Sequence, residues 1–330
     1  MVRFIVERFL GMIVTMVLVS MMVFVIMELP PGDYADRYAF RKFSGSGVSV
    51  TEADVAAIRA DLGLDVSAPE RYLNWISGIV LHGDFGQAFA FETSVVNVIG
   101  DKMWLTLLLV LLTLIITYAV SIPVGIYAAV KRGSAADYGL TVFSYLGLAL
   151  PNFLLALVLL YFANRWLGAG IGGLFSPEYD RAPWSFAKFM DLMGHLWLPA
   201  VVLAWSAVAY QLQTVRATMS DELNKLSVVA ARARGVPERK LLIKYPARVA
   251  INPVVSTIGF DVNRIFSELP IVAAVLGLTE LGGLLLKAYL DLDMYVAGAI
   301  LLLLTFVIVV MNFLSDVLLA ILDPRIKLGG

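Results

Sequence analysis

The sequence predicts an all-α integral membrane protein with six transmembrane helices. Of its 330 residues, 60% are hydrophobic and 15% are charged, and the mean hydropathy is +0.83. A soluble protein of this length needs a larger polar surface than such a composition supplies. A helix of about 20 apolar residues spans a bilayer, and six segments meet this requirement. They lie near 9–29, 104–130, 139–163, 195–217, 254–278 and 295–322.

The six spans are unevenly distributed, which predicts three parts. Residues 1–29 hold the first span, which we expect to be retained because it is too long for a signal peptide and lacks a small-residue cleavage site. Residues 30–103 form a polar segment in which Val55, Ile58 and Leu62 recur at helical spacing, so an extramembrane helical region is expected. Residues 104–330 carry the other five spans. Pro123 and Pro151 fall within two of them, where proline favours a kink.

Several kinds of chemistry are excluded by composition. The chain has no cysteine, so disulfides, thiolate metal sites and cysteine nucleophiles are absent. His82 and His195 stand far apart in the sequence, which argues against a histidine metal site. There is no Gly-x-x-x-x-Gly-Lys-Ser/Thr motif, so the chain does not bind ATP by the usual phosphate-binding loop. The sequence predicts no catalytic residue, no metal and no cofactor of its own.

The distribution of positive charge predicts the orientation. If the N-terminus is cytoplasmic, Lys and Arg residues are about threefold denser in the cytoplasmic segments than on the opposite side. This agrees with the positive-inside rule, so we expect both termini in the cytoplasm. The cytoplasmic charges are Arg3, Arg8, Lys131, Arg132, Lys225, Arg232, Arg234, Arg239, Lys240, Lys244, Arg248, Arg325 and Lys327.

The loop at 218–253 holds seven of these positive charges and a break between two short helices. Gly235 suits the left-handed conformation that ends a helix, and Pro237 suits the first turn of the next. Ser220 and Asp221 are expected to cap the first helix, and Pro253 to open the fifth span. On these grounds alone, a loop that binds lipid headgroups and one that docks on a soluble partner are equally plausible interpretations.

The same loop resembles the cytoplasmic loop of binding-protein-dependent ABC importer permeases of the dipeptide/oligopeptide family. The resemblance runs without a gap through Ala231, Arg232, Ala233, Gly235, Glu238, Arg239, Arg248 and Pro253. It extends over nearly the whole chain through Pro31-Gly32-Asp33, Leu62-Gly63-Leu64-Asp65, Gly83-Asp84-Phe85-Gly86, Ile122-Pro123-Val124-Gly125 and Asp323-Pro324-Arg325. The order of these motifs is similar to that in the first of the two permeases usually found in such systems.

The resemblance implies a type I ABC importer permease in a bacterial inner membrane, forming half of a heterodimeric path for a small polar solute. It implies as partners a second homologous permease, two cytoplasmic ATPase subunits that bind the ATP, and a periplasmic or lipid-anchored solute-binding protein, with membrane lipid around them and no nucleic acid. The loop would then be the ATPase-coupling element. Its expected coupling residues are Ala230, Ala231, Arg232, Ala233, Arg234, Gly235, Glu238 and Arg239, with the three alanines forming a small-residue face.

The fifth span carries ionisable side chains that are costly at membrane depth. Asp261, Asn263, Arg264 and Glu268 lie within it, and such groups usually face a bundle interior or a water-filled path. Spacings of three and four residues allow Asp261, Arg264 and Glu268 to share a helix face. They are candidates both for a lining of the translocation path and for an internal ion-pair network. Family positions nearby differ here, as Ala273 and Thr279-Glu280-Leu281-Gly282.

Three classes of function follow from these features. The leading one is a permease for peptides, with oligosaccharides, opines or nickel chelates as alternative solutes carried by relatives. A second is an intramembrane aspartyl protease using Asp180 or Asp261, although a Gly-x-Gly-Asp motif is missing. A third is a structural membrane scaffold. ATPase activity that appears only when the chain is assembled with its partners would distinguish the first class from the other two.

Overall fold

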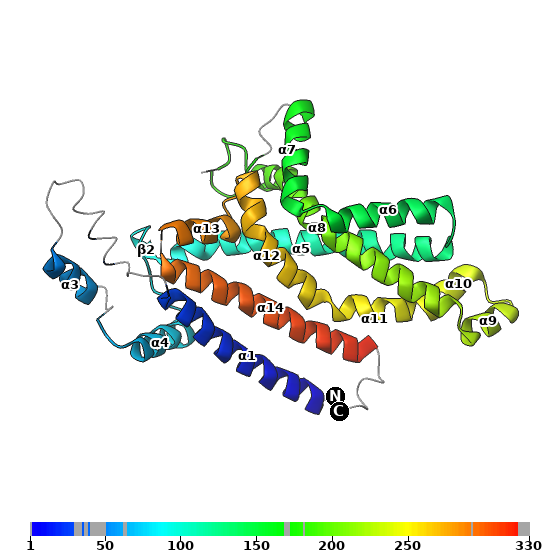
Figure 1. Cartoon of the computed structure of the whole chain (residues 1–330), viewed down its shortest axis with the longest axis horizontal. Helices are drawn as coiled ribbons and strands as arrows, with labels where there is room; N and C mark the ends of the chain where they lie inside the picture. Colours follow the sequence, from blue (N-terminus) through cyan, green and yellow to red (C-terminus); the bar gives the residue numbers. More distant parts are fainter. Residues whose placement is uncertain are drawn as a thin grey trace. The chain divides into compact units, whose positions relative to one another are not determined.

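The computed structural model describes residues 2–29, 51–61, 65–167, 172–180, 182–291 and 293–322, together with Ala35 and Ala39. Most of these residues are helical (Figure 1). The chain divides into two compact units that share its longest helices. The larger comprises Met1–Met12, Leu105–Gly283 and Ile308–Gly330, and the smaller comprises Ile13–Trp104 and Leu284–Val307. The motifs at 31–33 and 323–325, and most of the motif at 62–65, lie outside the described residues.

Four helices of the described chain are long and apolar enough to cross a membrane. They are α1 (Val2–Glu28), α5 (Val95–Val130), α8 (Phe186–Leu223) and α14 (Met294–Leu322). Two helix pairs pass the same test only when taken together: α6 (Ala135–Ala149) with α7 (Asn152–Leu167), bent by 105°, and α12 (Ile258–Leu276) with α13 (Leu281–Asp291), bent by 83°. By length and composition, the described residues therefore hold four candidate spans, or up to six if each bent pair is one span.

The two prolines inside predicted spans behave differently. α5 continues through Pro123 without ending, so the helix interior tolerates this residue. At Pro151, by contrast, the chain leaves the helix: α6 ends at Ala149, Leu150 is extended, and α7 starts at Asn152. Because a residue before proline is disfavoured in the helical conformation, Leu150 adopts ψ 122° and the direction of the chain changes. The predicted third span is thus two helices rather than one.

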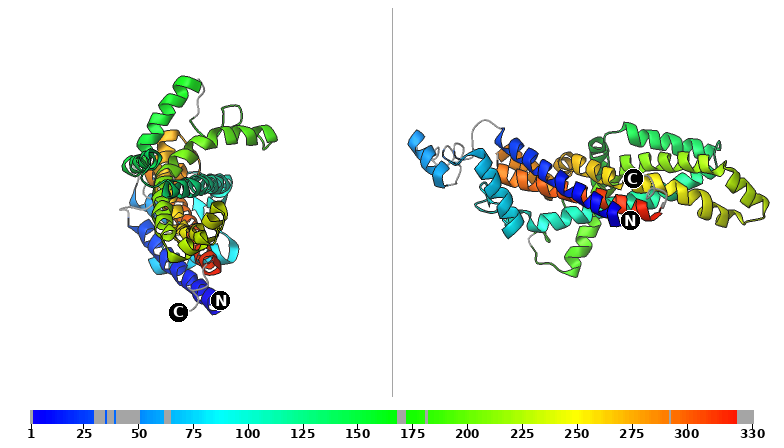
Figure 2. Two further views of the ribbon diagram at one scale, coloured as in Figure 1. Left: turned by 90° about the vertical axis from the view of Figure 1, so that its right-hand side faces the viewer. Right: turned by 90° about the horizontal axis from the view of Figure 1, so that it is seen from below.

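The larger unit is built around α8, whose buried face includes Leu196, Leu203 and Leu212. Helix α6 runs beside α8 (Figures 1 and 2) and approaches it closely at Gly147, where a Cβ atom would lie 2.7 Å from the Ala209 Cβ. Small residues permit such close helix contacts in membranes.

An ion pair fastens the same two helices near the end of α8. Arg216 donates to both oxygens of the Asp137 carboxylate, over 2.6 and 2.9 Å, and the Gly133 amide donates to the same group over 2.9 Å. A bidentate guanidinium–carboxylate contact fixes the relative orientation of the two side chains and is stronger than a single hydrogen bond. The turn between α5 and α6 is therefore tied to α8.

The smaller unit contains short helices and one hairpin beside parts of the long helices. Its elements are α3 (Glu52–Asp61), α4 (Ala68–Ser77), a π-helical turn (Gly78–His82), and the antiparallel strands β1 (Gln87–Ala88) and β2 (Thr93–Ser94), with Gln87 opposite Ser94. The predicted helix containing Val55 and Ile58 is confirmed as α3. Phe24, Tyr72 and Trp75 form an aromatic cluster that anchors α4 to α1.

The Gly83-Asp84-Phe85-Gly86 motif forms a compact turn in this unit. Gly83 and Gly86 both have positive φ, 67° and 96°. The Asp84 carboxylate accepts a hydrogen bond from the Gly86 amide over 2.9 Å, and a Cβ atom on Gly86 would lie 3.0 Å from the Tyr295 ring. Glycine is needed at position 86 because other residues rarely adopt this backbone conformation and because a side chain there would press against the Tyr295 ring.

Candidate functional site

The basic loop forms a helical hairpin at the end of α8 (Figures 1 and 2). It comprises α9 (Leu226–Ala233) and α10 (Glu238–Leu242), and a π-helical turn (Ile243–Ala247) leads into α11 (Arg248–Ser256). The predicted break is confirmed: Gly235 has φ 76°, and Pro237 directly precedes the first residue of α10. The left-handed conformation at Gly235 is the one that reverses the chain after a helix.

Two predicted helix boundaries in this region are wrong. Ser220 and Asp221 do not cap a new helix, because α8 continues through them to Leu223 and α9 is preceded by Lys225, which makes no side-chain cap. Pro253 lies inside α11 rather than at the start of the fifth span. In both cases packing against neighbouring helices overrides the local signal, since Ser220 is buried and α11 contacts α8.

A small core and one ion pair hold the hairpin together. Val228, Ala231 and Leu241 are buried against each other, which joins α9 to α10. Arg232 donates to the two oxygens of Glu238 over 2.8 and 3.2 Å, across the turn at Gly235. The hydrogen bonding from Arg232, and to a smaller extent its positive charge, holds the pKa of the Glu238 carboxyl below its ordinary value. Arg232 and Glu238 thus stabilise the hairpin itself.

The opposite face of α9 is exposed and apolar. Leu226 is 86% exposed and Val229 is 50% exposed, and Ala230 and Ala233 lie exposed on the same side. The predicted small-residue face is therefore corrected, because Ala231 points into the hairpin core. We call Leu226, Val229, Ala230 and Ala233 the α9 ridge. Arg234 and Arg239 are exposed beside the turn and add positive charge at its end.

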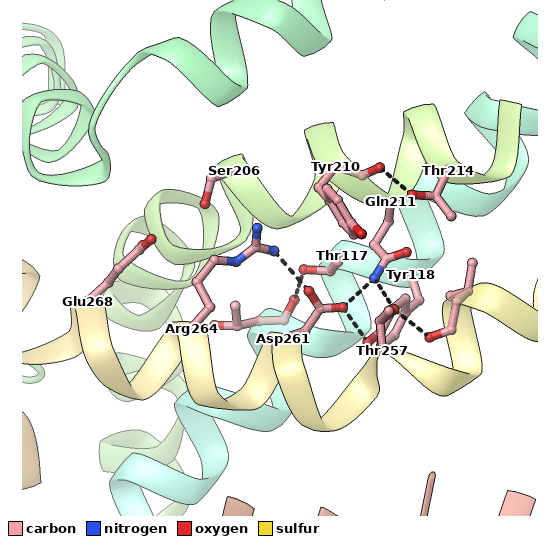
Figure 3. Close-up of polar contacts among 12 residues, drawn as sticks. Thr117, Tyr118, Ser206, Tyr210, Gln211, Thr214, Thr257, Asp261, Arg264 and Glu268 are labelled. Atoms are coloured by element: carbon pink, nitrogen blue, oxygen red, sulfur yellow. Dashed lines mark hydrogen bonds and ion pairs between the residues drawn. The ribbon is translucent and has the colours of Figure 1, made fainter. Parts of the chain in front are cut away.

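The second candidate region is a buried polar cluster centred on Asp261 of α12 (Figure 3). Asp261 is 0% exposed, and its carboxylate accepts hydrogen bonds from the Tyr118 hydroxyl (2.8 Å), the Gln211 amide (2.5 Å) and the Arg264 guanidinium (2.9 Å). Gln211 also donates to the Thr257 hydroxyl over 2.8 Å. A buried carboxylate needs such donors to offset its lost hydration. The cluster joins α5, α8 and α12.

The predicted polar face of the fifth span is only partly confirmed. Asp261 and Arg264 pair as expected, but Asn263 is exposed on another side of α12. Glu268 lies further along α12, apart from the Asp261 cluster (Figure 3), and accepts a hydrogen bond from the Asn152 amide at the start of α7. Among the described residues, Arg264 forms an ion pair with Asp261 and none with Glu268, so the expected contact between Arg264 and Glu268 is not formed.

Several members of these polar groups escape sequence reasoning. Tyr118, Gln211 and Asn152 come from three separate helices, α5, α8 and α7, and reach α12 only in the folded protein, whereas Thr257 directly precedes α12. Gln211 carries a weak signal, because it is an amide side chain that follows a mainly apolar stretch of α8. No second aspartate donates to or accepts from Asp261 among the described residues, so the pair that an aspartyl protease needs is not present there. The described residues also hold no group of three potential metal ligands.

These observations define a class: a multi-pass, all-helical membrane protein with a basic hairpin at the end of a central helix. The chain belongs to the family described as "Binding-protein-dependent transport system inner membrane component", whose model matches residues 121–328. A model for the N-terminal part of such membrane components matches residues 1–111. Together the two matches cover most of the chain, which confirms the family that the loop motif indicated.

Full-length relatives agree with this assignment. The chain is 33% identical to a "putative peptide permease protein" of Brucella ovis over 329 residues, 99% of each chain. It is 31% identical to the "oligopeptide transport system permease protein AppB" of Bacillus subtilis, covering 99% of this chain and 100% of the relative. It is 28% identical to a "probable peptide ABC transporter permease protein" of Sinorhizobium fredii, covering 98% and 99%. The chain is thus a permease subunit of an ABC importer.

Proposed function

We propose that this chain forms half of the peptide path of an ATP-driven importer in a bacterial inner membrane. The observation that carries the proposal is the full-length similarity to proteins named as peptide and oligopeptide permeases. A second homologous permease would complete the path, two cytoplasmic ATPases would drive it, and a binding protein would deliver the peptide.

The proposed topology has six spans with both termini in the cytoplasm. Each bent helix pair is then one span, and residues 218–253 lie on the cytoplasmic side because of their positive charge. Residues 1–29 supply the first span, residues 30–103 face the periplasm and help to receive the binding protein, and residues 104–330 form the core of the path.

The α9 ridge is the proposed contact with an ATPase subunit. Exposed apolar side chains in a row usually mark an interaction site. Small side chains at Ala230 and Ala233 allow close approach of a partner, while Arg234 and Arg239 can meet its carboxylates. The Arg232–Glu238 pair makes the hairpin rigid, and a rigid element transmits a rigid-body movement that a flexible loop would dissipate.

We expect Ala230→Trp to weaken ATPase binding by about tenfold or more, because an indole on the ridge prevents close approach. The measurement is the affinity of the cognate ATPase subunit for the purified permease pair. Ser227→Trp is the matched control, since position 227 is exposed on the same helix beside the ridge. Equal affinities for the two variants would assign the ATPase contact to another surface.

For the translocation path we propose the polar residues of α12: Asp261, Asn263, Arg264 and Glu268. We expect Glu268→Ala to change the ATPase activity stimulated by peptide-loaded binding protein more than the basal ATPase activity. Glu268 is only half-buried and has one hydrogen bond to the described residues, so it is the member best placed to meet a solute. An unchanged response to the loaded binding protein would limit Glu268 to helix packing.

A further inference from the structure

A cavity opens at the break between α6 and α7. Its volume is about 170 Å³, and its lining combines apolar side chains with the carboxylate of Glu268 and the amide of Asn152. The residues that line it are Pro151, Asn152, Phe153, Ser267, Glu268, Ile271 and Val272. A cavity of about 150 Å³ accepts a benzene-sized molecule. The cavity at Pro151 is therefore large enough for a small chemical group and the few atoms attached to it.

Among the described residues, the Glu268 carboxylate at this cavity makes no direct ion pair. Arg264 of α12 donates instead to Asp261, and only its more distant charge acts on Glu268. Within the part of the chain that the structure describes, no Lys or Arg nitrogen lies within 4.0 Å of the Glu268 carboxylate. Charged groups at membrane depth are normally paired. Glu268 thus offers a carboxylate with which a positively charged solute group can form a direct ion pair.

A second acceptor lies beside that carboxylate. Asn152 is 6% exposed and uses its amide nitrogen to contact Glu268 and the Ser206 hydroxyl. Its Oδ1 atom is buried and has no hydrogen-bond partner among the described residues. A buried acceptor without a partner is destabilising. An incoming donor that also carries positive charge would satisfy both Asn152 and Glu268.

We propose that this cavity, formed by Glu268 and Asn152 at the Pro151 break, is a subsite for a primary ammonium group of the transported solute. An ammonium has three N–H donors and no acceptor, which matches a carboxylate and an amide oxygen. The N-terminus of a peptide, or a lysine side chain, carries such a group. This inference rests on the proposed function, since it names the chemical group of a transported peptide that α12 would bind.

The absence of native cysteine makes a direct test possible. Ser267→Cys places a thiol in the cavity lining, and Ile271→Cys provides a second position if the first variant is not folded. In the assembled permease pair, each thiol is reacted with a cationic and an anionic methanethiosulfonate reagent, and the modification of this chain is followed on a gel. Asn263→Cys, exposed one turn away and outside the cavity, corrects for intrinsic reactivity.

We expect the thiol at Ser267→Cys to favour the cationic reagent. The ratio of its modification rate by the cationic reagent to that by the anionic reagent should be about tenfold higher than the same ratio at Asn263→Cys, because the nearby carboxylate attracts one reagent and repels the other. Adding Glu268→Gln should remove this preference. Trialanine should slow the modification, and N-acetyl-trialanine should slow it less. A preference that survives Glu268→Gln, or equal ratios at the two sites, would overturn the subsite. Because this experiment does not measure uptake, a negative result would overturn the subsite without contradicting the permease function.

Discussion

Gly235→Pro is expected to lower peptide uptake at least about tenfold while the protein remains folded in the membrane. Gly235 has φ 76°, whereas proline fixes φ near −65°. The substitution therefore prevents the reversal between α9 and α10, and it separates Arg232 from Glu238. The hairpin lies at the end of α8 and packs through its own small core, so the membrane helices should fold without it.

Gly235→Asn is the matched control, because asparagine is the side chain other than glycine that most readily adopts positive φ. We expect Gly235→Asn to keep most of the uptake. The measurement is ATP-dependent accumulation of labelled trialanine by cells or proteoliposomes, normalised to the amount of membrane-inserted permease. Normal uptake by Gly235→Pro would mean that the hairpin does not couple ATP hydrolysis to transport.

Asp261→Ala is expected to destabilise the protein by about 3–5 kcal/mol, the usual cost of removing one partner from a buried ion pair. The change leaves Arg264 without its carboxylate, and it also removes the acceptor for Tyr118 and Gln211. Thermal unfolding of the purified permease pair in detergent, followed by fluorescence, measures this effect.

Two further variants distinguish the effect of losing the ion pair from the effect of a general disturbance of α12. Asn263→Ala changes an exposed side chain two positions away, and its effect should stay within about 0.5 kcal/mol. The double variant Asp261→Leu with Arg264→Met removes both charges, and we expect it to recover much of the lost stability. A small effect of Asp261→Ala would show that water or lipid headgroups reach the cluster and replace its partners.

The helical fold follows from the sequence, but the bends do not. Long apolar segments identify α1, α5, α8 and α14 directly. In the regions of the third and fifth predicted spans, the apolar chain is instead divided into bent helix pairs, α6 with α7 and α12 with α13, which hydropathy cannot detect. Pro151 was a visible signal for the first bend, but Pro123 is the same residue type in a helix that continues. Whether a proline ends a helix depends on the packing around it.

The two candidate regions were predictable to different extents. The α9–α10 hairpin depends on local chemistry, so Gly235 and Pro237 were sufficient to place its turn. Its exposed face was misjudged at Ala231, because burial on a short helix depends on where α10 folds back. The polar cluster depends on tertiary contacts. Spacing along α12 identified Asp261 and Arg264, whereas Gln211 and Asn152 reach α12 from helices far away in the sequence.

We propose that this chain forms half of a peptide path driven by ATPases on other chains. The most direct measurement is peptide accumulation in proteoliposomes that contain this chain, its partner permease and the two ATPases, with the peptide-loaded binding protein outside. We expect ATP-dependent accumulation of trialanine that disappears when this chain is omitted and falls severalfold when it carries Ala230→Trp. Accumulation without this chain, or none with every component present and ATP being hydrolysed, would contradict it.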